Sequence, residues 1–111
     1  MKKEERTHMS NLDGKRAVYR NKKLLEAVRN FDCQLCGIGD STVVAAHSNQ
    51  LRDGKGKGIK AQDYRIAALC FRCHYEIDQG RVLNKEERKE QWEEAHRKTI
   101  GLLFENNIVK T

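Results

Sequence analysis

The sequence contains no proline, no apolar run long enough to cross a bilayer and no internal repeat. Without proline, the breaks between helices and strands must come from glycine, asparagine and aspartate. A membrane span needs about 20 predominantly apolar residues, so we expect no transmembrane helix. The first ten residues, MKKEERTHMS, lack the apolar segment of a secretory signal. We therefore expect a cytoplasmic protein with no membrane partner.

Apolar residues are also scarce relative to charged ones. Of the 111 residues, 38% are hydrophobic and 34% are charged, which suits one domain with a thin core. A core of that size gains from a disulfide or a bound metal. The four cysteines would suffice for two disulfides, but in a cytosolic chain we expect them to be reduced and bound to metal.

The positive charge is concentrated near the N-terminus. The net charge is +6, and residues 1–30 carry nine lysines and arginines against four acids, whereas residues 84–111 carry six of each. Basic chains of this size commonly bind nucleic acid, although a solvated basic face gives the same count.

Local patterns divide the single domain into four segments. Residues 1–12 are polar and resemble a disordered tail, and residues 13–30 predict a basic helix with Ala17, Leu24, Leu25 and Val28 facing inward. Residues 31–80 predict a metal knuckle followed by two strands, at 41–47 and 64–69, and a helix over 70–79. A last helix is expected over 84–105, begun by Asn84 with Glu87 in a capping box, and a short strand at 108–109.

The cysteines form two C-x2-C pairs, Cys33 with Cys36 and Cys70 with Cys73, separated by 33 residues. Each pair supplies two thiolates from one tight turn, and two such turns close a tetrahedral zinc site. The sequence therefore predicts one structural Zn²⁺ rather than four unrelated core cysteines.

Two further ligand types follow the second pair. His74 and Asp78 are four residues apart on the predicted helix, so they share one face and suit a second, open metal site. A helix-capping histidine and a surface aspartate would show the same spacing. His47 ends the first predicted strand. In a strand–strand–helix arrangement we expect it to lie near His74 and Asp78 on the helix. A neutral imidazole can take a proton from water, and a divalent ion can stabilise the charge that develops in phosphodiester hydrolysis.

Residues 33–78 resemble an HNH, or ββα-metal, endonuclease with an embedded cysteine zinc knuckle, in particular the small phage and prophage recombination nucleases of the YbcO-like group. The similarity lies in AAHSNQLRDGKGKGIKAQDYRIAALC, whose last cysteine opens the pattern C-x2-C-H-x-E-I-D. It implies an α+β fold with a small zinc-stapled core between N-terminal and C-terminal helices. It also implies DNA hydrolysis in phage recombination, repair or processing, within the bacterial host. In such enzymes His47 would be the general base, and His74 and Asp78 would hold a catalytic Mg²⁺, Mn²⁺ or Zn²⁺.

The chain differs from that family pattern at two positions. Many HNH enzymes have an aspartate or histidine ligand directly before the base, and here Ala46 occupies that position. Asp63 and Asn49 are the candidates to replace that ligand. The family's central asparagine, shortly before the second strand, is also missing, with Asp63 and Tyr64 nearby instead.

The loop RDGKGKGIK alternates cations with glycines. Glycines allow close approach of the backbone to phosphates and the cations neutralise them, whereas a flexible solvated loop would have the same composition. We expect Trp92 and Tyr64 to pack in the core rather than to stack on bases. The candidate phosphate contacts in this loop are Arg52, Lys55, Lys57 and Lys60.

The expected partner is DNA, with branched and single-stranded forms among the candidates, and a second copy of the chain or a recombination protein could join it. Two alternatives have no catalytic metal. One is a zinc-binding module that binds DNA without cutting it, and the other is a protein-interaction zinc domain of a phage accessory protein.

Overall fold

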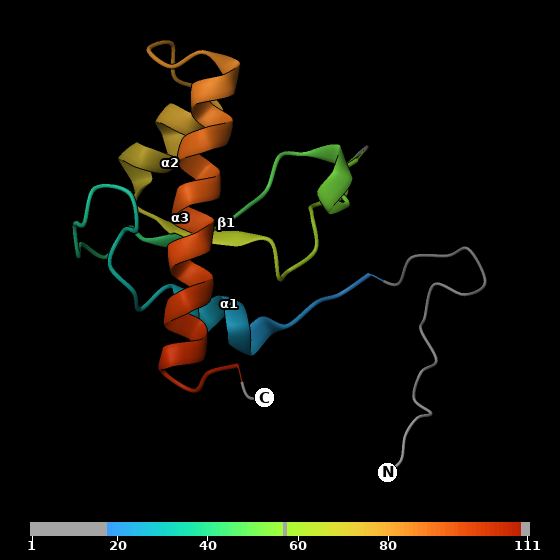
Figure 1. Cartoon of the computed structure of the whole chain (residues 1–111), viewed down its shortest axis with the longest axis vertical. Helices are drawn as coiled ribbons and strands as arrows, with labels where there is room; N and C mark the ends of the chain where they lie inside the picture. Colours follow the sequence, from blue (N-terminus) through green and yellow to red (C-terminus); the bar gives the residue numbers. More distant parts are fainter. Residues whose placement is uncertain (1–17, 57, 110–111) are drawn as a thin grey trace.

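The computed structural model describes residues 18–56 and 58–109 and shows a small α+β fold (Figure 1). Two short strands pair antiparallel and are accompanied by three α-helices and a 3-10 turn. The elements in chain order are α1 (Lys22–Val28), β1 (Val44–His47), η3 (Leu51–Asp53), β2 (Ile66–Leu69), α2 (Phe71–Asp78) and α3 (Lys85–Glu105). No helix of the described part is long and apolar enough to cross a membrane.

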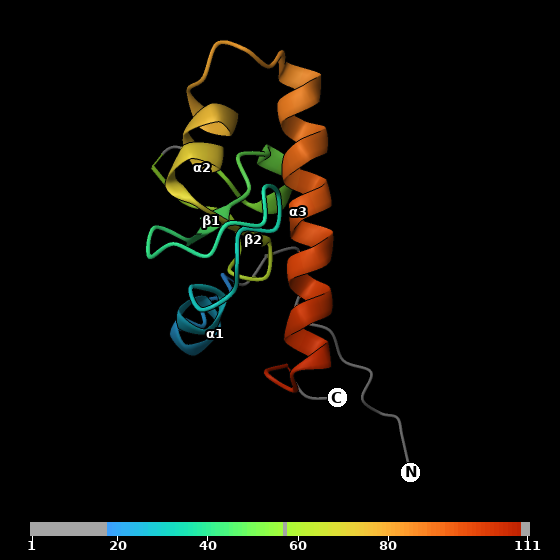
Figure 2. The ribbon, with the colours of Figure 1, turned by 90° about the vertical axis from the view of Figure 1, so that its left-hand side faces the viewer.

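Helix α3 forms one side of the molecule, and the sheet with α1 and α2 forms the other (Figure 2). The strands are in register from Val44 opposite Leu69 to His47 opposite Ile66. Helix α2 follows β2 and packs beside the first half of α3, whereas α1 packs at β1 near the opposite end of α3. This order, strand–loop–strand–helix between flanking helices, confirms the fold expected from the sequence.

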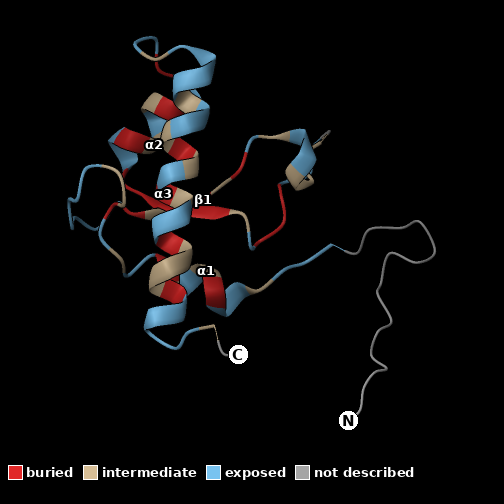
Figure 3. Ribbon diagram, in the orientation of Figure 1, coloured by how far each residue is buried: buried red, intermediate tan, exposed pale blue. Residues whose placement is uncertain are grey.

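The core lies between β2 and α3 (Figure 3). All four residues of β2 are buried, and the small side chains of Ala67 and Ala68 let the helix come close to the strand. The strand edge that β1 leaves open is covered by α3, because the Ala68 amide donates to Thr99 Oγ1 at 2.9 Å and His96 Nδ1 lies 2.7 Å from the Ile66 carbonyl oxygen. Side chains of one helix therefore protect the edge of a two-stranded sheet that would otherwise be exposed.

The long helix begins as predicted, with a capping box. Asn84 Oδ1 accepts from the Glu87 amide at 2.8 Å, and Glu87 Oε1 accepts from the Asn84 amide at 2.9 Å. These two bonds satisfy amides that have no partner within the first turn. The start of α3, and with it the position of its first basic residues, is thus fixed by local sequence.

The basic helix predicted over 13–30 is shorter in the structure, which places it at Lys22–Val28. Residues 13–17 of the prediction lie outside the described part, as does Ala17. Tertiary hydrogen bonds hold the described residues before α1 in extended form: the Tyr19 amide donates to Gln62 Oε1 at 2.6 Å, and the Tyr19 carbonyl accepts from the Asp63 amide at 3.1 Å. Asn21 then caps α1 by accepting from the Leu24 amide.

Three other expectations need correction. Both strands are shorter than predicted, at four residues each. The expected strand at 108–109 is absent, because Asn107 is left-handed and the amides of Ile108 and Val109 both donate to the Leu103 carbonyl, which folds the chain back on the end of α3. Tyr64 is 48% exposed rather than in the core, whereas Trp92 is buried as expected.

Candidate active site

The two cysteine pairs meet at one point beside the sheet. One ligand atom from each of Cys33, Cys36, Cys70 and Cys73 lies within 4.8 Å of the other three. The Sγ atoms of Cys36 and Cys70 are 3.7 Å apart. A tetrahedral zinc ion with Zn–S bonds of about 2.3 Å requires sulfurs separated by roughly 3.8 Å, so the four thiols fit one zinc ion.

Local structure presents these thiols. The first pair lies on a tight turn in which the Gly37 amide donates to the Cys33 carbonyl at 2.9 Å, and Gly37 has a φ of +84°, which a side chain would disfavour. The second pair comes from the start of α2, where Cys70 is the N-cap and Cys73 lies in the first turn. A bond from the Gln34 amide to the Ala68 carbonyl, at 2.8 Å, joins the first turn to β2.

The thiols differ in acidity. Burial raises the pKa of Cys33, but backbone hydrogen bonds around Cys36 and Cys70 outweigh it and lower the pKa to about 6. Burial and the neighbouring thiols raise the pKa of Cys73. Several thiolates in one buried cluster repel one another, and a divalent cation is the partner that allows all four to ionise.

His47 ends β1 and faces a buried carboxylate. Its Nε2 lies 2.7 Å from Oδ1 of Asp63, whose side chain is only 2% exposed. Asp63 Oδ2 accepts from the Asn21 amide at 2.7 Å, and Arg20 Nη1 lies 3.5 Å from Oδ1. Burial raises the pKa of Asp63, but the bonds from His47 and Asn21 outweigh it and hold the pKa below its usual value. Asp63 is therefore an anion that orients the imidazole.

A second histidine–carboxylate pair lies on α2. His74 Nε2 is 2.9 Å from Asp78 Oδ2, and Asn49 Nδ2 donates to Asp78 Oδ1 at 2.7 Å. The hydrogen bond to Asp78 raises the pKa of His74. For Asp78, burial raises the pKa, but the bonds from His74 and Asn49 and the charge of Lys55 outweigh it and lower the pKa. Asn49 comes two residues after His47 in the chain, so this contact joins the strand end to the helix.

The structure thus separates the two carboxylates that the sequence grouped. Asp63 faces His47 rather than His74, and Asn49 rather than Asp63 contacts Asp78. Within residues 18–56 and 58–109, the four cysteines are the one group of three or more cysteine, histidine or acidic side chains close enough to share a metal. His74 and Asp78 form a pair rather than such a group, so they could offer two ligand side chains to an ion.

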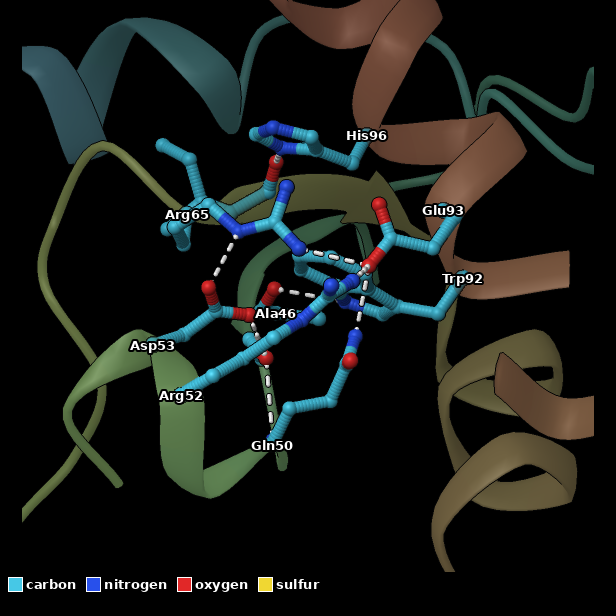
Figure 4. Close-up of polar contacts among 10 residues, drawn as sticks. Ala46, Gln50, Arg52, Asp53, Arg65, Trp92, Glu93 and His96 are labelled. Carbon is cyan, nitrogen blue, oxygen red and sulfur yellow. Dashed lines mark hydrogen bonds and ion pairs between the residues drawn. The ribbon is translucent and has the colours of Figure 1, made fainter. Parts of the chain in front are cut away.

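A polar network that sequence reasoning missed fixes the loop after His47 (Figure 4). Arg65 Nη2 lies 2.5 Å from Glu93 Oε2 and its Nε lies 2.9 Å from Asp53 Oδ1, while the guanidinium sits 4.9 Å from the centre of the Trp92 ring. Gln50 also donates to Glu93, at 2.5 Å. These contacts join η3 to α3. The sequence around Glu93 does not predict them, because its alternating charges are common on solvent-exposed helices.

The basic loop residues have different surroundings. Arg52 Nη2 lies 3.2 Å from Glu93 Oε2, so its charge is partly neutralised within the protein. Lys55 lies close enough to Asp78 to lower its pKa, and Lys60 is exposed. Lys57 lies outside the described residues. Gly54, at a φ of +95°, ends η3 and packs against Gln62, so this glycine serves a turn.

Comparisons with known proteins bear on the fold alone. No protein-family model matches the sequence, and no curated protein does. A solved structure from Escherichia coli str. K-12 substr. MG1655, described as "a putative bacteriophage protein", is similar in fold, with a TM-score of 0.56 and 24% sequence identity. The similarity covers 75% of this chain and 98% of that one. At this identity the match establishes a shared fold.

Proposed function

We propose that the protein is a metal-dependent endonuclease of the HNH type that hydrolyses phosphodiester bonds in DNA. The proposal rests on two histidine–carboxylate pairs, His47 with Asp63 at the end of β1 and His74 with Asp78 on α2. It rests also on the hydrogen bond by which Asn49, two residues after His47, contacts Asp78. A base and a histidine–carboxylate pair on adjoining elements suit hydrolysis assisted by a divalent ion.

In this proposal His47 removes a proton from the attacking water. An Nε2–H that donates to the Asp63 carboxylate leaves Nδ1 as the proton acceptor, and the Asp63 anion stabilises the imidazolium that forms. The ring is only 16% exposed, so packing limits its rotation. Asp63 acts through His47 and is therefore a positioning residue.

His74 and Asp78 would hold the second metal ion, and Mg²⁺, Mn²⁺ and Zn²⁺ are its candidates. When bound, such an ion supplies stabilisation of negative charge on the reacting phosphate. Asn49 holds one Asp78 oxygen in place at 2.7 Å, and Lys55 adds positive charge beside it. Lys55 and Lys60 supply the phosphate contacts of the loop, with Lys57 between them in the sequence.

The cysteine cluster has a different role in the proposal. Zn²⁺ bound there by four thiolates would have no open position and would stabilise the fold. It would fix the end of β2 and the start of α2, the helix that carries His74. The shared fold with the Escherichia coli structure is consistent with a phage or prophage protein that acts on DNA in recombination, repair or processing, in the bacterial cytoplasm.

One observation favours a second candidate, a zinc module that binds DNA without cutting it. Among the described residues, no third cysteine, histidine or acidic side chain joins His74 and Asp78. In that case the Asn49–Asp78 hydrogen bond would only hold the loop after β1 against α2. His47 would only serve as the hydrogen-bond partner of the buried Asp63.

A cleavage assay separates the two candidates. Wild-type protein is incubated with single-stranded, nicked, branched and duplex DNA, each with Mg²⁺, Mn²⁺ or Zn²⁺. Under the nuclease proposal at least one DNA form is cut, and His47→Ala lowers the rate about 10²- to 10⁴-fold, the usual contribution of a positioned acid–base group. Zinc content and folding should survive, because His47 is not part of the cysteine shell.

Thr99→Val is the control, because it removes a hydroxyl that accepts from the Ala68 amide on the other edge of β2. It should lower the melting temperature and leave the cleavage rate of the folded protein unchanged. If His47→Ala behaves like this control, or if the wild type cuts no DNA with any of the three metals, the nuclease proposal is wrong.

A further inference from the structure

A pocket of about 530 Å³ opens beside the Asp78 carboxylate, between α2 and the first turns of α3. We call it the α2–α3 pocket. Its apolar wall and its basic residues come largely from different places, because α2 and the following turn supply aliphatic side chains and α3 supplies the cations. Its lining residues are Asn49, Gln50, Ile77, Asp78, Leu83, Lys85, Arg88, Lys89 and Trp92.

The basic side of the pocket follows from helical spacing. Lys85, Arg88, Lys89 and Trp92 recur at intervals of three and four residues, so they share one face of α3. Glu86, Glu90, Glu93 and Glu94 line a neighbouring hollow together with Lys89 and Arg97. Lys89 therefore lies at the border between the two hollows. The α2–α3 pocket itself is lined by three cations of α3 and by one carboxylate, that of Asp78.

The cations of the pocket are not all equivalent. Arg88 donates to the carbonyls of Gly80 and Leu83, so it holds the turn between α2 and α3. Lys85 and Lys89 are exposed, and neither has a carboxylate partner within 4.0 Å among the described residues. Two ammonium groups one helical turn apart can therefore bind an anion without first breaking an ion pair.

The apolar wall is suited to a flat group. Ile77 and Trp92 are each 5% exposed, and Leu83 is half-buried. Arg65 lies over the Trp92 ring, and the His96 ring stacks on it at 5.0 Å, which fixes the indole in the wall. A hollow with an apolar wall, two free cations and an amide at its rim matches the parts of a nucleotide, a base and a phosphate.

We infer that the α2–α3 pocket receives one unpaired nucleotide of the DNA strand, with its base against Leu83 and Ile77 and a neighbouring phosphate at Lys85 and Lys89. The inference rests on the proposed function for DNA as the substrate, and it narrows that substrate to DNA with a single-stranded segment. A base within a continuous duplex is stacked and paired, and bringing it into a pocket costs the free energy of unstacking.

Trp92 makes this inference directly measurable, because it is the one tryptophan of the chain and it lines the pocket. The His47→Ala protein, which should bind without cutting, is titrated with a ten-nucleotide thymidine oligomer, a duplex of ten base pairs and an abasic oligomer of ten units, without added divalent metal. We expect the thymidine oligomer to change Trp92 fluorescence and to bind at least tenfold more tightly than the duplex. The abasic oligomer should bind weakly and leave the fluorescence unchanged.

Lys85→Gln/Lys89→Gln should then lower the affinity for the thymidine oligomer about tenfold. It should also reduce the slope of log K against log salt by about 0.7, the contribution of one phosphate contact on a single strand. Lys22→Gln/Lys23→Gln is the control, since both lysines are exposed on α1, at the far end of α3 from the pocket. The control should change binding to single strand and duplex equally.

The outcomes separate this inference from the proposed function. Unchanged single-strand binding by Lys85→Gln/Lys89→Gln, or equal fluorescence changes with the abasic oligomer, would overturn the pocket assignment even if the protein cuts DNA. Binding of a phosphorylated peptide that quenches Trp92 and excludes the oligomer would overturn it as well. Tight, lysine-dependent binding of the oligomer by a protein that cuts no DNA would support the pocket and refute the nuclease.

Discussion

The four-cysteine cluster and the face around His47 differ in how the chain builds them. Each half of the cluster comes from one tight turn, and three of its four cysteines are buried. We use the term His47 face for the side chains of His47, Asn49, Asp63, His74 and Asp78, which come from distant parts of the chain and are joined by single hydrogen bonds or ion pairs. The side chains of His74 and Asp78 are 36% and 31% exposed. A closed shell suits a structural ion, whereas the proposed second metal site needs partly exposed side chains of this kind to leave positions for water and substrate.

This contrast separates stability from chemistry. The cluster joins the turn before β1 to the start of α2, so its loss releases both ends of the small core. His47, His74 and Asp78 lie outside the hydrophobic core cluster, so these side chains could be replaced with that cluster intact. We therefore expect substitutions at the two places to change different measurements, unfolding at the first and cleavage or binding at the second.

The largest effect is expected at the closed shell. Cys73→Ser removes one of four thiolates, and structural zinc sites contribute about 10–16 kcal/mol in small metal-dependent domains. The variant should lose zinc and unfold, as seen by circular dichroism and by metal analysis. Ser41→Ala, at an exposed position of the loop between the first cysteine pair and β1, is a suitable control. A metal-free wild type with an unchanged cooperative melt would show that the cluster does not hold the fold.

This cluster is also the part of the site that sequence predicts best. Ligands three residues apart lie in one turn whatever the rest of the chain does, and the capping box of Asn84 and Glu87 is local in the same sense. The strand–strand–helix order followed from short β-branched runs and glycine breaks, although both strands came out shorter than predicted.

Contacts between distant segments were beyond the same reasoning. Asp63 was a candidate metal ligand, and nothing in its neighbours indicates that it faces His47, 16 residues earlier. The residues before α1 look helical by composition, and hydrogen bonds from Tyr19, Arg20 and Asn21 to residues 60–63 override that propensity. The Arg65–Glu93 pair likewise joins residues 28 apart. Local patterns cannot encode such pairings.

The next largest effect separates the two aspartates. Asp78→Asn should lower cleavage about 100-fold, and millimolar Mn²⁺ should restore part of it, because a weakened metal site can be refilled by mass action. Asp63→Asn should also lower cleavage, but without recovery at high Mn²⁺, because Asp63 contacts His47 rather than the metal pair. Recovery of both variants to the same extent would place Asp63 among the metal ligands.

A smaller effect is expected where Glu93 ties the loop to α3. Burial raises the pKa of Glu93, but the bonds from Arg65 and Gln50 outweigh it and lower the pKa. A carboxyl whose folded pKa is depressed stabilises the fold above its unfolded pKa, near 4.3, and loses that contribution as the pH falls through the folded value. Glu93→Gln should cost about 1–2 kcal/mol at pH 7.

The same depressed pKa predicts the pH dependence of that cost. The difference in melting temperature between wild type and Glu93→Gln should be largest at neutral pH and should shrink below about pH 4.5. Loss of zinc in acid lowers both melting curves together, so the difference remains interpretable. A difference that grows as the pH falls would contradict the assignment of Glu93 as an anion in the native network.

The smallest effect is expected from single cations of the loop. Lys60 is exposed, and Lys55 lies near Asp78, whereas Arg52 is already paired with Glu93 at 3.2 Å. Each lysine that contacts a phosphate should contribute about 0.9 to the slope of log K against log salt on duplex DNA. We therefore expect Lys55→Gln and Lys60→Gln each to flatten that slope, on every DNA sequence alike. Arg52→Gln, with the same change of charge in the same loop, is the matched control and should flatten the slope less.

The slope is measured by fluorescence anisotropy between about 50 and 200 mM salt, the range over which such contacts dominate affinity. Equal slopes for wild type and both lysine variants would show that the loop does not touch phosphates. A larger change for Arg52→Gln than for either lysine would show that Arg52 leaves Glu93 when DNA binds.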